Sequence, residues 1–113
     1  MKFEEEVIVG DILPAIRSVM ADGLQRNYGL TQEDIASKLE VTQPAVSQYM
    51  NDERADQEVV EKIRDDPQVS LIIDEAVSKA ARNDDYSGDI GHAIQTIRDK
   101  GLFKEKFQDT RKL

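Results

Sequence analysis

The run from Val41 to Asn51 contains no charged residue, although 34% of the chain is charged. Its polar side chains are amides and hydroxyls, among them Gln43, Ser47 and Gln48. A glutamine amide can hold adenine through two hydrogen bonds at the major-groove edge of DNA, and serine can bond several bases. Acidic residues at this place would repel phosphate. We therefore interpret the run as a surface that reads bases.

Two short helices are expected to position these side chains. Thr31 is a good N-cap for the first, and Asp34 three residues later comes close to a capping box. Thr42 can cap the second helix, where Pro44 falls in the first turn and its missing N–H does no harm. The inward-facing residues of the pair are expected to be Ile35, Ala36, Leu39, Ala45, Val46, Tyr49 and Met50.

The connection between these helices is short, because only Glu40, Val41 and Thr42 separate them. Ala36 is small enough to stand where the two helices cross, and apolar residues flank the turn on both sides. This pattern predicts a helix-turn-helix over Gln32–Met50, a motif in which the second helix stands out from the protein and enters the major groove. An ordinary pair of core helices is the alternative interpretation.

The segment from Leu30 to Asn51 resembles the helix-turn-helix of the Cro and lambda-repressor family. It is still more similar to a group of small archaeal predicted transcriptional regulators, which share the run Val-Thr-Gln-Pro-Ala-Val-Ser-Gln. The stretch Ile-Leu-Pro-Ala-Ile-Arg, Ile12 to Arg17, also looks like that group. The resemblance covers Ile12 to Asn51.

The resemblance implies that Gln32 bonds a phosphate and braces the reading helix, and that Asn51 grips a phosphate after it. It places Gln43, Pro44 and Gln48 where base edges are contacted, and geometry adds Ser47. The residues expected to bind DNA are Gln32, Thr42, Gln43, Pro44, Ser47, Gln48 and Asn51.

Two features depart from the pattern of these families. The family usually has glycine, in a left-handed conformation, where this chain has Glu40, and the substitution is expected to cost about 1 kcal/mol. Some of the archaeal relatives carry cysteines near the C-terminus. This chain has no cysteine, so a metal site of that kind is not expected here.

The remaining chain follows a helical period. We expect helices over about 4–26, 56–65 and 67–81, and a last one that Asp89 caps and Gly101 ends. Pro14 predicts a kink or a helix that begins near Asp11, and Val7 to Val9 could start a strand. The tail from Phe103 is expected to be frayed and solvated, although its cations Lys104, Lys106, Arg111 and Lys112 could also reach DNA phosphates.

This pattern predicts an all-α orthogonal bundle of five to six helices in a single domain, 1–113. The helix-turn-helix would occupy 31–51, and residues 55–102 would form a supporting and dimerising region. We expect a symmetric homodimer on double-stranded DNA. The long N-terminal helix and the stripe Ile72, Ile73 and Val77 are the candidate dimer surfaces.

The net charge of −8 is unusual for such a protein, because DNA-binding proteins are typically basic. The acids are spread along the chain and form no separate tail. A high-salt cytoplasm would explain an acidic surface. The alternative is that the chain is a protein-interaction or antitoxin-like adaptor built on a helix-turn-helix, with a protein partner in place of DNA.

Other classes find little support in the sequence. Without cysteine there is no disulfide or zinc finger, and a single histidine, His92, makes a His-rich metal site unexpected. No nucleophile–base pair or glycine-rich phosphate loop indicates an enzyme or a cofactor. Asp65–Asp66 and Asp84–Asp85 are interpreted as caps and loop residues. The acidic N-terminus lacks the plan of a secretion signal, so a cytoplasmic protein is expected.

Overall fold

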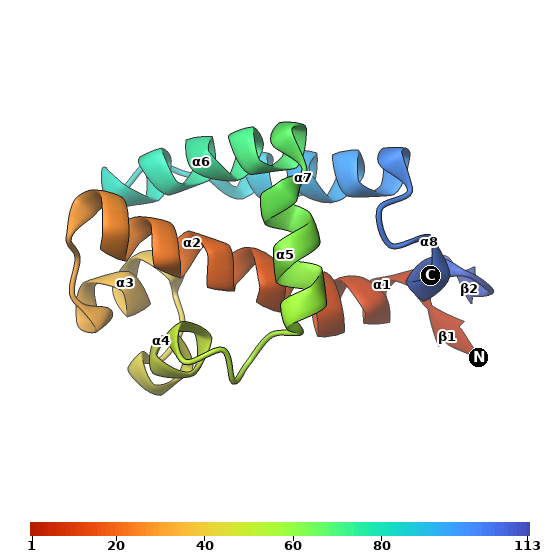
Figure 1. Ribbon diagram of the computed structural model, residues 1–113, viewed down its shortest axis with the longest axis horizontal. Coiled ribbons are helices and arrows are strands. Elements are labelled where there is room, and N and C mark those ends of the chain that lie inside the picture. The colour runs from red at the N-terminus through yellow and green to blue at the C-terminus, as the bar shows by residue number, and fades with distance from the viewer.

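The computed structural model describes residues 1–113 and is almost entirely helical, which confirms the predicted all-α bundle (Figure 1). No helix combines the length and the apolar character that a membrane crossing needs. The elements in chain order are β1 (Lys2–Phe3), α1 (Glu4–Val7), the π-helix η1 (Ile8–Ile12), α2 (Leu13–Tyr28), α3 (Gln32–Leu39), α4 (Gln43–Met50), α5 (Gln57–Asp65), α6 (Pro67–Ala81), α7 (Ser87–Lys100), α8 (Lys104–Phe107) and β2 (Thr110–Arg111).

The N-terminal helix passes through Pro14 by means of a π turn. Within η1 the spacing of hydrogen bonds widens, and the N–H of Leu13 donates to the carbonyl of Ile8. A π turn gives the proline ring room and changes the bonding where its N–H is missing. The helix therefore starts at Glu4 and not near Asp11. Val7 to Val9 start no strand and lie in α1 and η1, because a first turn of three glutamates favours a helix there.

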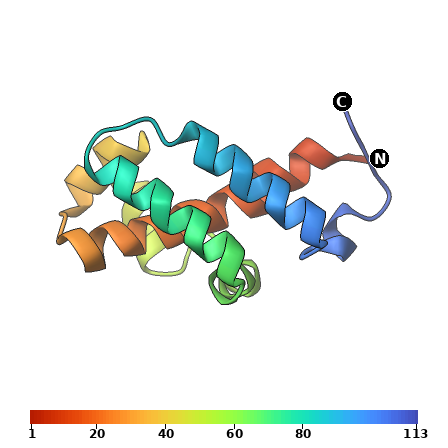
Figure 2. The same ribbon diagram turned by 90° about the horizontal axis from the view of Figure 1, so that it is seen from above.

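The helices pack in layers around the central α2. Helices α6 and α7 run side by side on one side of α2, whereas α3 and α4 lie on the other, and α5 crosses between the two groups (Figures 1 and 2). The approach of α2 and α6 is close at Gly23, where a Cβ atom would lie 3.2 Å from a methyl group of Val77. This arrangement leaves the α3–α4 pair at one edge of the molecule.

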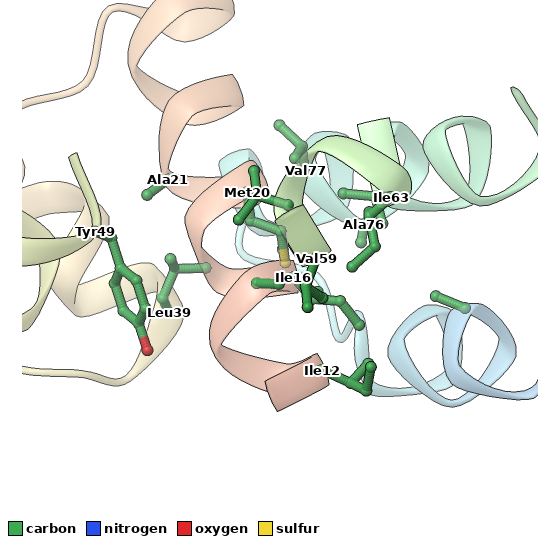
Figure 3. Close-up of a cluster of buried hydrophobic side chains, with 14 of the residues drawn as sticks. Ile12, Ile16, Met20, Ala21, Leu39, Tyr49, Val59, Ile63, Ala76 and Val77 are labelled. Atoms are coloured by element: carbon green, nitrogen blue, oxygen red, sulfur yellow. The ribbon is translucent and has the colours of Figure 1, made fainter. Parts of the chain in front are cut away.

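One continuous cluster of 25 buried residues forms the core. From η1 and α2, the side chains of Ile12, Ile16 and Met20 follow one another at intervals of four residues and meet side chains from α5 and α6 (Figure 3). Of the predicted stripe Ile72, Ile73 and Val77, the last two belong to this core and are almost fully buried, and Ile72 is half-buried against it. The expectation that their stripe forms a dimer surface is therefore wrong, since the chain covers it with its own helices.

The C-terminal tail folds back onto the N-terminus and is not frayed, contrary to the prediction. Phe103 and Phe107 are only 3% and 8% exposed. β2 pairs with β1 in parallel, with Lys2 opposite Thr110. The guanidinium of Arg98 lies 3.7 Å from the centre of the Phe107 ring. These long-range contacts hold a segment whose local sequence is too short and too charged to predict as ordered.

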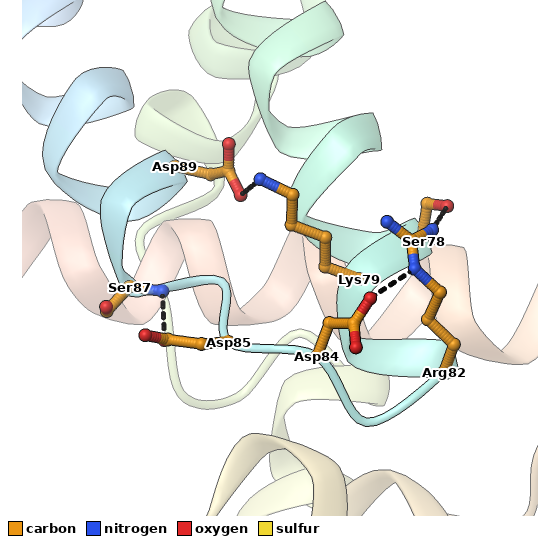
Figure 4. A network of polar contacts seen from close by, with 7 residues as sticks. All are labelled: Ser78, Lys79, Arg82, Asp84, Asp85, Ser87 and Asp89. Atoms are coloured by element: carbon orange, nitrogen blue, oxygen red, sulfur yellow. Dashed lines mark hydrogen bonds and ion pairs between the residues drawn. The ribbon is translucent and has the colours of Figure 1, made fainter.

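The loop before α7 uses different caps from the one expected (Figure 4). Asp85, and not Asp89, accepts the backbone N–H of Ser87 at 2.9 Å, and this hydrogen bonding lowers the pKa of Asp85. Asp89 lies in the first turn of α7 and pairs with Lys79 of α6 at 2.9 Å, which raises the pKa of the lysine. The ion pair thus joins the two antiparallel helices.

Candidate nucleic-acid interface

Both helices of the motif begin at the predicted threonine caps. The Thr31 hydroxyl accepts the N–H of Asp34 at 3.2 Å, and the Thr42 hydroxyl accepts the N–H of Ala45 at the same distance. Each bond satisfies an N–H group that the first turn of a helix leaves free. Pro44 stands in the first turn of α4, as the sequence predicted.

The turn between the helices is a Schellman motif centred on Glu40. This residue adopts the left-handed conformation, with φ 56° and ψ 43°. The N–H of Val41 donates to the carbonyl of Ala36 at 3.0 Å, and the N–H of Glu40 donates to Ser37 at 3.3 Å. The chain therefore makes the turn for which the family uses glycine, although a side chain is present.

The apolar faces of α3 and α4 are turned into the protein. Ile35, Ala36 and Leu39 of α3 are buried, and so are Ala45, Val46 and Tyr49 of α4. Figure 3 shows Leu39 and Tyr49 beside the side chains of α2. The apolar residues of α4 lie on one face of the helix. The opposite face of α4 is therefore turned toward solvent.

The residues predicted to read DNA lie on or beside this outer face. Thr42, Gln43, Pro44 and Asn51 are exposed, while Gln32, Ser47 and Gln48 are half-buried. Figure 1 shows α4 at an edge of the molecule, on the side of α2 away from α6 and α7. The C-terminal helices therefore do not cover α4.

Gln32 connects the two helices of the motif. Its side-chain amide donates to the sulfur of Met50 at 3.9 Å, which links the first turn of α3 to the last turn of α4. Thioether sulfur is a weak acceptor. The side chain is thus placed as a brace, and little is lost if its amide turns to a stronger acceptor such as phosphate.

Arg54 is a residue of this surface that the sequence analysis missed. Its Nη1 atom donates to Oε1 of Gln48 at 2.5 Å, and its guanidinium lies 5.7 Å from the centre of the Tyr49 ring. Arg54 is the first basic residue after the charge-free run. This position in the sequence was the only indication that Arg54 belongs to the surface. The two acidic residues before it, Asp52 and Glu53, made the segment look unsuited to DNA.

Lys38, the other basic residue near the motif, faces a different way. Its ammonium donates to the carbonyl of Ala81 at 3.1 Å and to the side chain of Asn83 at 2.8 Å. In return, the Tyr86 hydroxyl donates to the carbonyl of Lys38 at 3.0 Å, and burial raises the pKa of that tyrosine. These bonds fix α3 to the α6–α7 loop, so Lys38 serves the scaffold.

Comparison with known proteins supports the resemblance over the motif. A family model described as helix-turn-helix matches residues 24–72, a segment that contains α3, α4 and α5. The match supports the resemblance to the Cro and lambda-repressor type of helix-turn-helix, and it covers less than half of the chain. Searches of curated proteins and of solved structures give no match, so the closer likeness to archaeal regulators stays a prediction.

Proposed function

We propose that this protein is a sequence-specific transcriptional regulator that inserts α4 into the major groove of DNA. The observation that carries the proposal is the outer face of α4, whose own residues are uncharged and include two glutamines, and which the C-terminal helices do not cover. The helix-turn-helix match over residues 24–72 supports the same function. Such a protein would act where the DNA is, in the cytoplasm of a cell without a nucleus.

The side chains divide by the part of DNA they would touch. Gln43 and Gln48 would contact base edges, with Ser47 and Pro44 beside them in the groove. Thr42, Gln32 and Asn51 flank α4 and would contact phosphates, which fix the position of the helix but read no sequence. Each good pairing of a side chain with a base is worth about 1–3 kcal/mol of discrimination.

The proposal includes a symmetric dimer. A helix of eight residues can reach only a few base pairs, and two copies about 34 Å apart would read both halves of a palindrome. The dimer contact would lie outside the motif. Two large apolar side chains outside the motif are well exposed and could form this contact. They are Leu71 of α6, which is 70% exposed, and Val9 of η1, which is 63% exposed.

The test is a selection of genomic DNA fragments by the wild-type protein at several salt concentrations. A regulator should enrich fragments that share one short sequence. Gln43→Ala and Gln48→Ala should each weaken binding to that sequence by about 1–3 kcal/mol. Gln68→Ala is the matched control, because Gln68 is an exposed glutamine at the start of α6 and should leave affinity unchanged.

Another result would favour a different function. If no shared sequence is enriched at any salt concentration and a protein is captured instead, the chain is an adaptor that uses the helix-turn-helix as a scaffold. Equal effects of Gln68→Ala and Gln48→Ala would also contradict the proposal, since binding would then not depend on α4.

A further inference from the structure

The backbone after α4 turns back toward the helix that it leaves. Asp52 has a positive φ of 60°. The N–H of Glu53 donates to the carbonyl of Gln48 at 2.8 Å, and the N–H of Asp52 donates to Tyr49 at 3.3 Å. This is a second Schellman motif, and it reverses the direction of the chain. Arg54 is thereby brought back over the last turns of α4.

The contact between Arg54 and Gln48 fixes which end of the glutamine amide is occupied. A guanidinium carries only hydrogen-bond donors, so the partner of Arg54 has to be the amide oxygen Oε1 and not the nitrogen. The Tyr49 ring beside Arg54 is 4% exposed and belongs to the core. Cation–π attraction to a ring held this firmly supports the position of the guanidinium.

We propose that Arg54 is a positioning residue that makes Gln48 read guanine in preference to adenine. This inference rests on the proposed function. A glutamine that reads adenine uses both ends of its amide, because Oε1 accepts from N6 while Nε2 donates to N7. In this chain Arg54 already takes one of the two lone pairs of Oε1, which makes this oxygen a poorer acceptor for N6. The two N–H groups on Nε2 remain, and guanine offers two acceptors, O6 and N7, on the same edge.

The consequence is that two side chains of unlike type decide one base position. Gln48 supplies the contact with the base. Arg54, six residues later, determines which end of the Gln48 amide faces the base. Without Arg54 the amide can rotate by half a turn, and the preference for a base with a donor and an acceptor returns. Gln43 has no such partner and serves as an internal reference in the same helix.

The experiment selects random DNA duplexes with the wild type, Gln48→Ala, Arg54→Met and the control Arg82→Met. Methionine keeps much of the length of arginine but donates no hydrogen bond, and Arg82 is an exposed arginine at the end of α6. The wild type should require guanine at one position that becomes indifferent in Gln48→Ala. In Arg54→Met the ratio of guanine to adenine at that position should fall about tenfold or more, a change of roughly 1.4 kcal/mol.

Three results would overturn the inference. The Gln48-dependent position could be adenine in the wild type. Alternatively, Arg54→Met could keep guanine there and weaken binding to all sequences equally, which is the behaviour of a phosphate contact. If the wild type enriches no sequence at all, the proposed function fails as well, and this outcome separates the two failures.

A measurement without DNA tests the arrangement directly. In the free protein, the side-chain amide resonances of Gln48 should shift in Arg54→Met, and those of Gln43 should not. Unchanged Gln48 resonances would contradict the contact. Because Arg54 is exposed, the variant is expected to fold, which its thermal unfolding curve checks.

Discussion

Glu40 illustrates how a single residue can fit the motif at a cost in stability. The turn requires a left-handed conformation, which glycine adopts freely and which crowds the Cβ atom of any other residue. The strain comes from the backbone conformation itself, so a change in the surrounding side chains would not remove it. The sequence predicted both the position and the penalty, because the family pattern has glycine there.

Replacing Glu40 by glycine is therefore expected to stabilise the protein by about 1 kcal/mol, the left-handed strain less the added entropy of glycine in the unfolded chain. Urea denaturation measures the free energy of unfolding. Glu40→Ala is the matched control, because it removes the carboxylate and keeps the strain, and it should give little or no gain. A loss of stability in Glu40→Gly would contradict this account of the turn.

Arg54 shows the limit of prediction at the same scale. The glutamines were found because their types and the absence of charge around them are visible in the sequence. The position of Arg54 depends on the positive φ of Asp52, which the residue types alone do not determine. A side chain placed by a turn of this kind is found only once the backbone is known.

At the scale of elements, five helices end in a similar way. Helices α2, α3, α4, α6 and α7 each close with two backbone hydrogen bonds around a residue of positive φ. Glycine occupies this place after α2 and α7, and the sequence predicted the end of α7 from Gly101. The others are Glu40, Asp52 and Asn83. The left-handed turn at Glu40 was expected from the family pattern, whereas at Asp52 and Asn83 the helix ends were predicted approximately and their geometry was not.

The start of α6 shows a cap that also joins two helices. Asp66 accepts the N–H groups of Gln68 and Val69 at 3.1 and 3.0 Å, as predicted from the Asp66–Pro67 pair. It also forms an ion pair with Lys100, from the last turn of α7, at 2.7 Å. The sequence predicted both helix ends, but nothing in it shows that they meet in space.

This pair makes stability depend on pH. The ammonium of Lys100 and the backbone N–H of Val69 lower the pKa of Asp66 below its ordinary value of 3.8. A lowered pKa in the folded state stabilises the protein above the unfolded pKa, and this stabilisation is lost as the pH falls through the folded pKa. Asp66→Asn keeps a capping side chain and should be less stable than wild type at pH 7.

The measurement is the free energy of unfolding of both proteins at a series of pH values. The difference between them should stay constant above about pH 5 and shrink as the pH falls below 3.8. A difference that remains constant down to pH 2 would show that the charge of Asp66 contributes nothing and that only the cap matters.

At the scale of the whole molecule, the two ends of the chain close the bundle. Glu4, in the first turn of the N-terminal helix, accepts from Arg98 of α7 at 2.6 Å. The same arginine covers Phe107. The sequence did not predict this closure, because α8 is only four residues long and three of them are charged. Its order comes from partners about a hundred residues away.

Phe107→Ala should therefore destabilise the protein by about 3 kcal/mol, as expected for a buried aromatic side chain. Chemical denaturation is the measurement. Leu113→Ala is the control, since Leu113 is 83% exposed and its loss should change little. Equal effects of the two substitutions would indicate that the tail does not pack against the N-terminus.

The net charge of −8 also belongs to the whole molecule. Of the two basic residues in 28–54, Lys38 is engaged by the α6–α7 loop, which leaves Arg54 beside α4. Since each neutralised phosphate adds about 0.9 to the slope of log affinity against log salt concentration, a shallow slope of about 1–3 per protomer is expected.

Binding titrations of the selected duplex at increasing salt concentration measure this slope. A slope of about 6 or more per protomer would contradict the expectation, because it would require the cations of the C-terminal segment to reach the DNA. A shallow slope would also explain how an acidic protein binds DNA in a high-salt cytoplasm, since little of its affinity would come from counterion release.

The most direct test of the central claim maps the bound DNA onto the protein. Amide resonances are recorded with and without a duplex that carries the selected sequence. We predict the largest changes in Gln43–Met50 and in the flanking Thr42 and Asn51, with α6 and α7 little affected. Changes confined to Lys104–Lys112, with α4 unaltered, would contradict the claim that α4 reads DNA.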